Sequence, residues 1–289
     1  MESSIPDVER PRSVAVGIDG FATAASTVQY AIELAAERSG HVLAITAFRA
    51  PAGPADLVTA DYAQHAAAAR IRWALAQVQV PSRMRVDELV VPGDPARVLA
   101  GVGACTDLLV IGRHHVEFLT QIFAPPVASA IAGTAVRPVI VVPPGWDRRP
   151  FGDSPIVVAL DGETAADAVL AFAFAEAEYR NASVWALHTA PEGLDAAGLD
   201  AERTNVAEIL AGVLQDHPDI AVRTRLIPGH PAEQIVRLST TAGLIVVGAP
   251  HRFRGAPWAG SVARTVLDRT NCPLAIVPTT GPMRSSRTS

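Results

Sequence analysis

The chain contains two copies of one sequence pattern. Three segments of the first half return in the second half in the same order: VAVGIDG (14–20) as IVVALDG (156–162), VVPGDPARVLA (90–100) as LIPGHPAEQIV (226–236), and DLLVIG (107–112) as GLIVVG (243–248). The aspartates of the first pair are 142 residues apart (161 − 19), and the first prolines of the second pair are 136 apart (228 − 92). Copies of this length are whole domains and not short solenoid repeats. The repetition therefore predicts two domains of the same fold.

The two copies are separated by a short segment with the composition of a linker. Residues 143–150 read PPGWDRRP, which is rich in proline and charge. A chain of 289 residues has room for two domains of common size, each with its own core. We predict one domain over residues 10–145 and a second over residues 153–280.

Short apolar runs alternate with helical stretches in both halves. Unbroken apolar runs such as residues 14–18 predict strands that are buried on both faces, whereas residues 24–38 carry apolar side chains at helical spacing. The expected strands are 14–18, 42–47, 85–91, 108–111 and 139–142, then 156–160, 184–188, 222–227, 244–247 and 274–277. The expected helices are 24–38, 61–76, 95–103 and 127–132, then 165–180, 201–215, 231–239 and 262–269. Strands that alternate with helices form parallel sheets with right-handed crossovers. The predicted class is α/β, with two tandem open, doubly wound parallel sheets of five strands, flanked by helices.

In such sheets, ligands bind beyond the carboxyl ends of the strands, near the point where the strand order reverses. Three loops of each half are expected there. One follows the first strand and begins at Asp19 or Asp161, and one follows the third strand. The last follows the fourth strand and begins at Gly112 or Gly248.

Taken together, these motifs resemble those of the universal stress protein family in its tandem form. The shared features are Asp-Gly after the first strand, a P-G-x-P-A segment before a helix, the LLVIG or LIVVG strand, and a last strand within RPVIVVP or CPLAIVP. They extend from about residue 14 to residue 277. The resemblance implies the adenine-nucleotide alpha-hydrolase-like fold and a regulatory role in the stress response. It also implies that the last strands of the two domains, 139–142 and 274–277, pair within the chain and cover edges that would otherwise be exposed.

Many members of that family bind ATP, which the resemblance makes the candidate cofactor. The family motif is a G-x-x-G segment followed further on by Gly-Ser or Gly-Thr at the start of a helix. Glycines let backbone N–H groups approach phosphate, and the helix N-terminus adds donors and a favourable dipole. The family's aspartate after the first strand contacts the adenosine end, and the resemblance places it at Asp19 and Asp161.

The first half departs furthest from the ATP motif. His115 stands where the second glycine is expected after Gly112, and Pro125-Pro126 replaces the Gly-Ser pair. Because proline has no N–H to donate, this half is predicted to have lost its phosphate cradle.

The second half retains more of the motif. His251 replaces the second glycine, but Gly260-Ser261 is kept at a spacing of 12 from Gly248 (260 − 248), one residue shorter than in the family. We predict that an adenine nucleotide binds mainly in the C-terminal half. The candidate contacts are Asp161, Gly248, His251, Gly260 and Ser261, with Asp19 and Gly112 as the first half's counterparts.

These residues also have local structural interpretations. Asp-Gly starts a turn, and the aspartate can cap the helix that follows. Ser261 can be a helix N-cap, which uses the same free N–H groups as an anion would. The basic residues Arg252, Arg254 and Arg264 can pair with phosphates or simply solvate the loop.

Composition and motifs argue against several functional classes. The 24 basic and 29 acidic residues give a net charge of −5, without the positive field that nucleic acids attract. Cys105 and Cys272 form no CxxC pair, and the adjacent His114-His115 lacks a third metal ligand. The polar N-terminus and the absence of an apolar run near ~20 residues predict a cytoplasmic protein that does not enter membranes.

No catalytic apparatus is evident in the sequence. It contains no G-x-S-x-G elbow and no P-loop, and neither a general base nor metal ligands can be named. We expect a non-enzymatic regulator and leave slow ATP hydrolysis open. The alternative is an interaction scaffold of the same fold that binds no nucleotide. In both cases a protein partner of unknown identity and a homodimer are left open.

Overall fold

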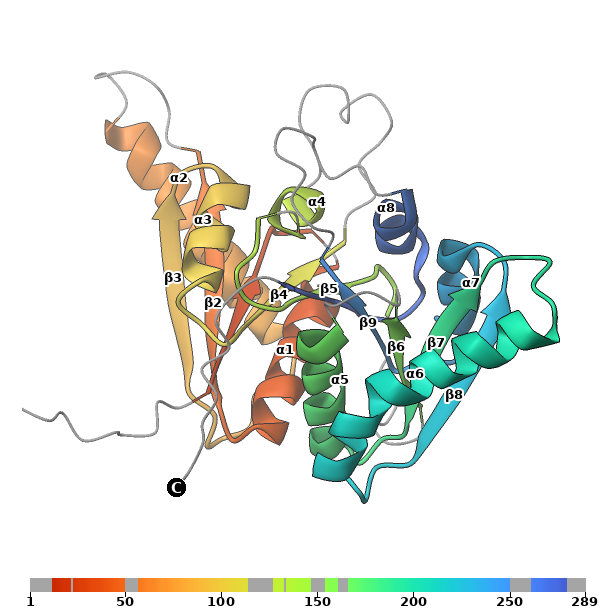
Figure 1. The fold of residues 1–289 in the computed structure, drawn as a ribbon. Coiled ribbons are helices and arrows are strands. Elements are labelled where there is room, and N and C mark those ends of the chain that lie inside the picture. The colour runs from red at the N-terminus through yellow and green to blue at the C-terminus, as the bar shows by residue number, and fades with distance from the viewer. Residues whose placement is uncertain are drawn as a thin grey trace, which may run out of the picture.

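The computed structural model describes residues 12–21, 23–49, 57–113, 127–132, 134–146, 154–160, 166–249 and 261–279 of the chain. Strands and helices alternate through both halves (Figure 1). The order β-α-β-α-β-α-β-α-β predicted for each half is confirmed.

The N-terminal half contains five strands and four helices in its described parts. In chain order they are β1 (Ser13–Gly17), α1 (Ala24–Glu37), β2 (His41–Phe48), α2 (Leu57–Ala76), β3 (Val86–Pro92), α3 (Pro95–Gly103), β4 (Leu108–Gly112), α4 (Val127–Ala132) and β5 (Val139–Val142). All four residues of β5 are buried, which explains why this strand has a continuous apolar sequence.

The C-terminal half repeats these elements. They are β6 (Ile156–Leu160), α5 (Ala166–Arg180), β7 (Val184–Ala190), α6 (Ala196–Asp216), β8 (Val222–Pro228), α7 (Pro231–Leu238), β9 (Leu244–Gly248), α8 (Ser261–Arg269) and β10 (Leu274–Val277). Helix α6 begins earlier than the predicted residue 201. The Asp195 carboxylate accepts a hydrogen bond from Gly198 N at 2.9 Å and caps a largely exposed first turn, which carries no apolar pattern.

The two sets of strands form one sheet of ten strands, in the order β3-β2-β1-β4-β5-β10-β9-β6-β7-β8. All pairs within each half are parallel, and β1 lies between β2 and β4 as β6 lies between β7 and β9. In both halves, the second and third strands extend the sheet on one side of the first strand. The fourth and fifth strands extend it on the other side. The strand order therefore reverses between β1 and β4, and between β6 and β9.

The halves are joined by the antiparallel pair β5 and β10, in which Ile140 lies opposite Ala275. This is the pairing that the resemblance implies. It joins the two expected five-stranded sheets into one and leaves β3 and β8 as the outer strands (Figure 1).

Two hydrophobic clusters fill the two faces of the sheet, and each runs through both halves. One lies under α1, α2, α5 and α6, and the other under α3, α4, α7 and α8. Side chains of a strand alternate between them, so that Val14 and Val16 belong to the first cluster and Ala15 to the second. Among the helices in the described parts of the chain, none combines the length and apolar character needed to cross a membrane. The α/β class with helices on both faces is thus confirmed.

Candidate functional site

The candidate site of each half lies beyond the carboxyl ends of the first and fourth strands, and we call this position the N-terminal or the C-terminal crevice. These strands are β1 and β4 in the N-terminal half, and β6 and β9 in the C-terminal half. They are neighbours in the sheet and mark the point where the strand order reverses. Ligands of open α/β sheets bind at such points.

In the N-terminal crevice, Asp19 is held within its own turn. Its Oδ1 accepts a hydrogen bond from Phe21 N at 3.0 Å, and Gly20 has a φ of +84°. A Cβ on Gly20 would lie 2.8 Å from Arg70 Cδ, so the Arg70 side chain from α2 lies against this turn. Asp19 therefore accepts a hydrogen bond within a turn, as its local structural interpretation predicts. The contact of Arg70 with this turn was not predicted from the sequence.

Gly112 and Gly248 end the fourth strands, and both have a packing role. A Cβ on Gly112 would lie 2.8 Å from Thr27 Oγ1 of α1. A Cβ on Gly248 would lie 3.4 Å from Val169 Cγ2 of α5 and 3.2 Å from Thr279 Cγ2. The glycine in the first half is thus required for the close approach of α1, whereas the second half leaves more room at the same position.

The loops after the third strands differ in how they start the next helix. Asp94 is the N-cap of α3 and accepts a hydrogen bond from Arg97 N at 3.2 Å. His230 occupies the N-cap position of α7 without making such a bond. His230 is therefore a loop residue equivalent to Asp94, as the comparison of the two copies suggests.

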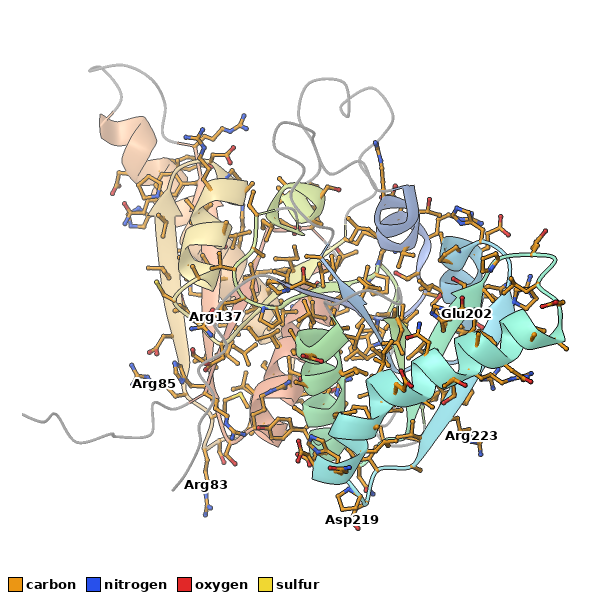
Figure 2. The ribbon with its side chains drawn as sticks, in the orientation of Figure 1. Arg83, Arg85, Arg137, Glu202, Asp219 and Arg223 are labelled. Carbon is orange, nitrogen blue, oxygen red and sulfur yellow. The ribbon has the colours of Figure 1, made fainter. Side chains whose placement is uncertain are left out.

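A buried histidine that sequence reasoning missed lies on β7, beside the C-terminal crevice. His188, near the end of β7, has 6% of its surface exposed. Its Nδ1 lies 3.1 Å from the carbonyl oxygen of Leu160, the last residue of β6. Its Nε2 lies 2.9 Å from Glu202 Oε2. Glu202 lies on α6 (Figure 2). The sequence feature that could have identified His188 is its place within the largely apolar strand β7.

A cation from the N-terminal half reaches the C-terminal half at α8. Arg113 directly follows β4, and its Nη1 donates to the carbonyl oxygen of Leu267 at 2.9 Å and to Thr270 Oγ1 at 3.3 Å. Burial lowers the pKa of Arg113, while nearby Asp268 opposes that effect. A cation at this position stabilises the carbonyl end of the α8 dipole. The residue after β9 in the other copy is Ala249, which has no such side chain.

Several predicted contacts lie outside the described residues. These are Asp161, His251 and Gly260, together with His114, His115, Pro125, Pro126, Arg252 and Arg254. Ser261 is the first residue of α8. In the described ranges, no group of three or more His, Cys, Asp or Glu side chains could hold a metal ion.

The sequence of this chain matches one protein family along most of its length. The sequence profile of the universal stress protein family matches residues 11–143 and 154–278. Universal stress protein Rv2028c of Mycobacterium tuberculosis (strain ATCC 25618 / H37Rv) is 26% identical over 279 residues, which cover 93% of this chain and 96% of that protein. A universal stress protein of Mycolicibacterium smegmatis is 25% identical over 289 residues, which cover 91% and 96%.

Solved structures share the fold across both halves. The crystal structure of a universal stress protein from Archaeoglobus fulgidus has a TM-score of 0.62 at 16% identity, covering 92% of this chain and 96% of that chain. The structure of PA1789 from Pseudomonas aeruginosa, described as functionally unknown, has a TM-score of 0.62 at 18% identity, covering 93% and 92%. Because the family profile matches both copies of the repeated pattern, the chain belongs to the universal stress protein family.

Proposed function

We propose that this protein is a non-enzymatic regulator that binds an adenine nucleotide, with ATP as the candidate, mainly in its C-terminal half. The proposed contacts are Asp161, Gly248, His251, Gly260 and Ser261. The adenosine end would meet Asp161, and the phosphates would meet the loop after β9 and the start of α8.

The reversal of strand order between β6 and β9 is the observation that carries this proposal. Leu160 and Gly248 end neighbouring parallel strands, and Asp161 directly follows Leu160 in the chain. Helix α8 begins at Ser261, and the free N–H groups of a helix start favour anions. Arg113 meets the carbonyl end of the same helix, where a cation complements the α8 dipole.

The N-terminal half supports this asymmetry. There the Asp19 carboxylate accepts a bond within its own turn, and Arg70 lies against Gly20. Arg113, at the start of the loop that carries the phosphate motif in the family, instead contacts the other half. The same observations favour a second candidate function, in which the protein is an interaction scaffold without a nucleotide.

Calorimetric titration with ATP tests the proposal and separates it from the scaffold function. The wild-type chain should bind ATP, Asp161→Ala should bind it much more weakly, and the matched variant Asp19→Ala should bind it as the wild type does. Denaturation of protein purified from cells should release an adenine nucleotide.

Two results would contradict the proposal. No released nucleotide together with no heat at millimolar ATP would favour the scaffold. Equal affinity of wild type and Asp161→Ala would exclude the proposed adenosine contact.

A further inference from the structure

Helix α2 carries two aromatic side chains on its outer surface. Tyr62 and Trp73 are 74% and 45% exposed. They are 11 residues apart (73 − 62), which is roughly three helical turns, so they lie on the same face of the helix. Ala67, Ile71 and Ala74 are fully buried on its other side. Aromatic side chains that gather on one exposed helix face are typical of a docking surface.

Helix α6 is the counterpart of α2 in the other copy, but its outer surface is smooth. The buried residue Ile71 of α2 corresponds to the buried Leu210 of α6, 139 positions later (210 − 71). The same offset places Ala201 and Gly212 at the positions of the two aromatic residues (201 − 62 and 212 − 73), and both are exposed. In the described part of the chain, a Cβ built on Gly212 would have no neighbour within 4 Å beyond the helix itself. Bulky side chains on α2 thus match small residues on α6 at the same spacing.

The two helices also differ in charge. Helix α2 contains two arginines and one aspartate, a sum of +1 with histidine neutral (2 − 1). Helix α6 contains one arginine and four acidic residues, a sum of −3 (1 − 4). The charged residues of α6 are Asp200, Glu202, Arg203, Glu208 and Asp216. The helices have 20 and 21 residues and are therefore both about 30 Å long.

The outer strands beside these helices carry the opposite signs. Strand β3, which contacts α2, contains Asp87 and Glu88, whereas β8, which contacts α6, contains Arg223 and Arg225. Arg85, just before β3, pairs with Asp87 at 2.8 Å, and Glu88 is exposed. The two strands and their helices lie at opposite ends of the sheet (Figure 1). One end therefore combines a basic helix with an acidic strand, and the other end combines an acidic helix with a basic strand.

We propose that the α2 end of one copy of this chain docks against the α6 end of a second copy. Tyr62 and Trp73 of one copy then pack on the smooth surface around Gly212 of the other, and each charged element meets one of opposite sign. Contact between two α2 ends, or between two α6 ends, would bring like charges together. The contact is therefore head-to-tail. It is independent of the proposed nucleotide binding.

The mass of the protein in solution tests this contact. A head-to-tail pair leaves one α2 end and one α6 end free, so further copies add unless a ring closes. In sedimentation at low ionic strength, the average mass of the full chain should exceed that of a single chain and increase with protein concentration. High salt should weaken the association, because it screens the exposed charges of both ends.

Two variants each remove one side of the contact. Tyr62→Ala combined with Trp73→Ala removes the aromatic side chains, and Gly212→Gln fills the smooth surface. Each should raise the dissociation constant about tenfold or more, as substitutions in the centre of an interface do. Gln64→Ala and Ala207→Gln are the matched controls and should associate as the wild type does. They change exposed residues that lie roughly 180° and 140° around the helix from Trp73 and Gly212.

A mixture of the two contact variants tests the head-to-tail arrangement itself. The double variant retains its α6 surface, and Gly212→Gln retains its α2 surface. One contact can form between them, and the resulting pair cannot extend. Each variant alone should sediment as a single chain, whereas the mixture should form complexes of one chain of each kind.

Three results would overturn this inference. The first is a wild type that remains a single chain up to millimolar concentration at low ionic strength. The second is association that persists unchanged in both contact variants, which would assign it to another surface. The third is a mixture of the two variants that stays as single chains, because a head-to-tail contact requires that they complement each other.

Discussion

The guanidinium of Arg180 donates to the hydroxyl of Tyr30 at 2.7 Å, and this bond joins the last turn of α5 to α1 of the other half. Arg180 also pairs with Glu176 at 2.9 Å, and Arg38 from the N-terminal half bonds to the same carboxylate. Glu176 and Arg180 are 1% and 4% exposed, so this contact between the halves is both buried and charged.

Removal of the Arg180 side chain should destabilise the protein strongly. In Arg180→Ala, the buried Glu176 carboxylate loses one of its two cations, and breaking a buried pair costs about 3–5 kcal/mol. Tyr30→Phe removes one hydroxyl and should cost about 1 kcal/mol. Chemical denaturation of both variants measures the difference. Equal losses would show that the charge on Arg180 has little effect.

The stability of this interface should depend on pH through Glu37. Burial raises the pKa of Glu37 to about 7, against the attraction of Arg180 and Arg38. Because the folded pKa lies above the ordinary value of 4.5, the contribution of Glu37 to stability is complete below pH 4.5 and is lost as the pH rises through 7.

Glu37→Gln should therefore match the wild type at acidic pH and exceed its free energy of unfolding above neutral pH. The carboxyl is partly exposed, so solvent screening limits the expected gain to about 1 kcal/mol. Urea denaturation of both proteins across this pH range measures the gain. A constant difference between them at all pH values would contradict the assignment.

The two matched glycines should respond differently to alanine. Gly112→Ala places a methyl group 2.8 Å from Thr27 Oγ1, a hydroxyl that also donates to the Thr23 carbonyl. The overpacking should cost about 1–3 kcal/mol. Gly248→Ala meets its neighbours at 3.2 and 3.4 Å and should cost less. Thermal unfolding of Gly112→Ala with and without Thr27→Ala should reveal partial rescue in the double variant.

The matched helix starts offer a second comparison between the copies. Asp94→Ala should lose about 1 kcal/mol, because the bond from Arg97 N caps α3. His230→Ala should be nearly neutral, since His230 makes no such bond to α7. His230→Asp should stabilise the protein if the two loops are equivalent. Denaturation midpoints of the three variants test this directly.

The contact of Arg113 with α8 should stabilise the end of that helix. Arg113→Ala removes donors to Leu267 and Thr270 and should cost about 1–2 kcal/mol. The amides of α8 should exchange faster in this variant. Arg137→Ala, at an exposed arginine of the same half, is the control and should leave α8 unchanged (Figure 2).

The unbroken apolar runs were sufficient to predict inner strands such as β4, β5, β9 and β10, because a strand covered on both faces must be apolar along its length. The pairing of β5 with β10 followed from family resemblance, since nothing in the four residues of either strand specifies a partner. The long-range polar contacts could not be predicted from sequence. Arg113 meets Leu267 across 154 positions and Arg180 meets Tyr30 across 150, and no local pattern encodes such distances.

For the candidate site, the sequence predicted the strand ends at which the strand order reverses, but not the side chains that lie near them. Arg70, His188 and Glu202 lie on helices or strands whose periodic patterns indicate only that the elements exist. Their roles depend on which elements become neighbours in the folded sheet.

Because the two copies lie in one polypeptide, the contact between them does not have to be symmetric. Arg38 and Arg180 are matched residues (180 − 38 is 142), but both bond to Glu176, whose own counterpart is the buried Leu34. In a twofold dimer of identical subunits, every residue occurs twice. Both subunits would therefore have a glutamate at this position, or neither would. Within one polypeptide a single carboxylate can serve two guanidinium groups, and each half can diverge while its neighbour stays unchanged.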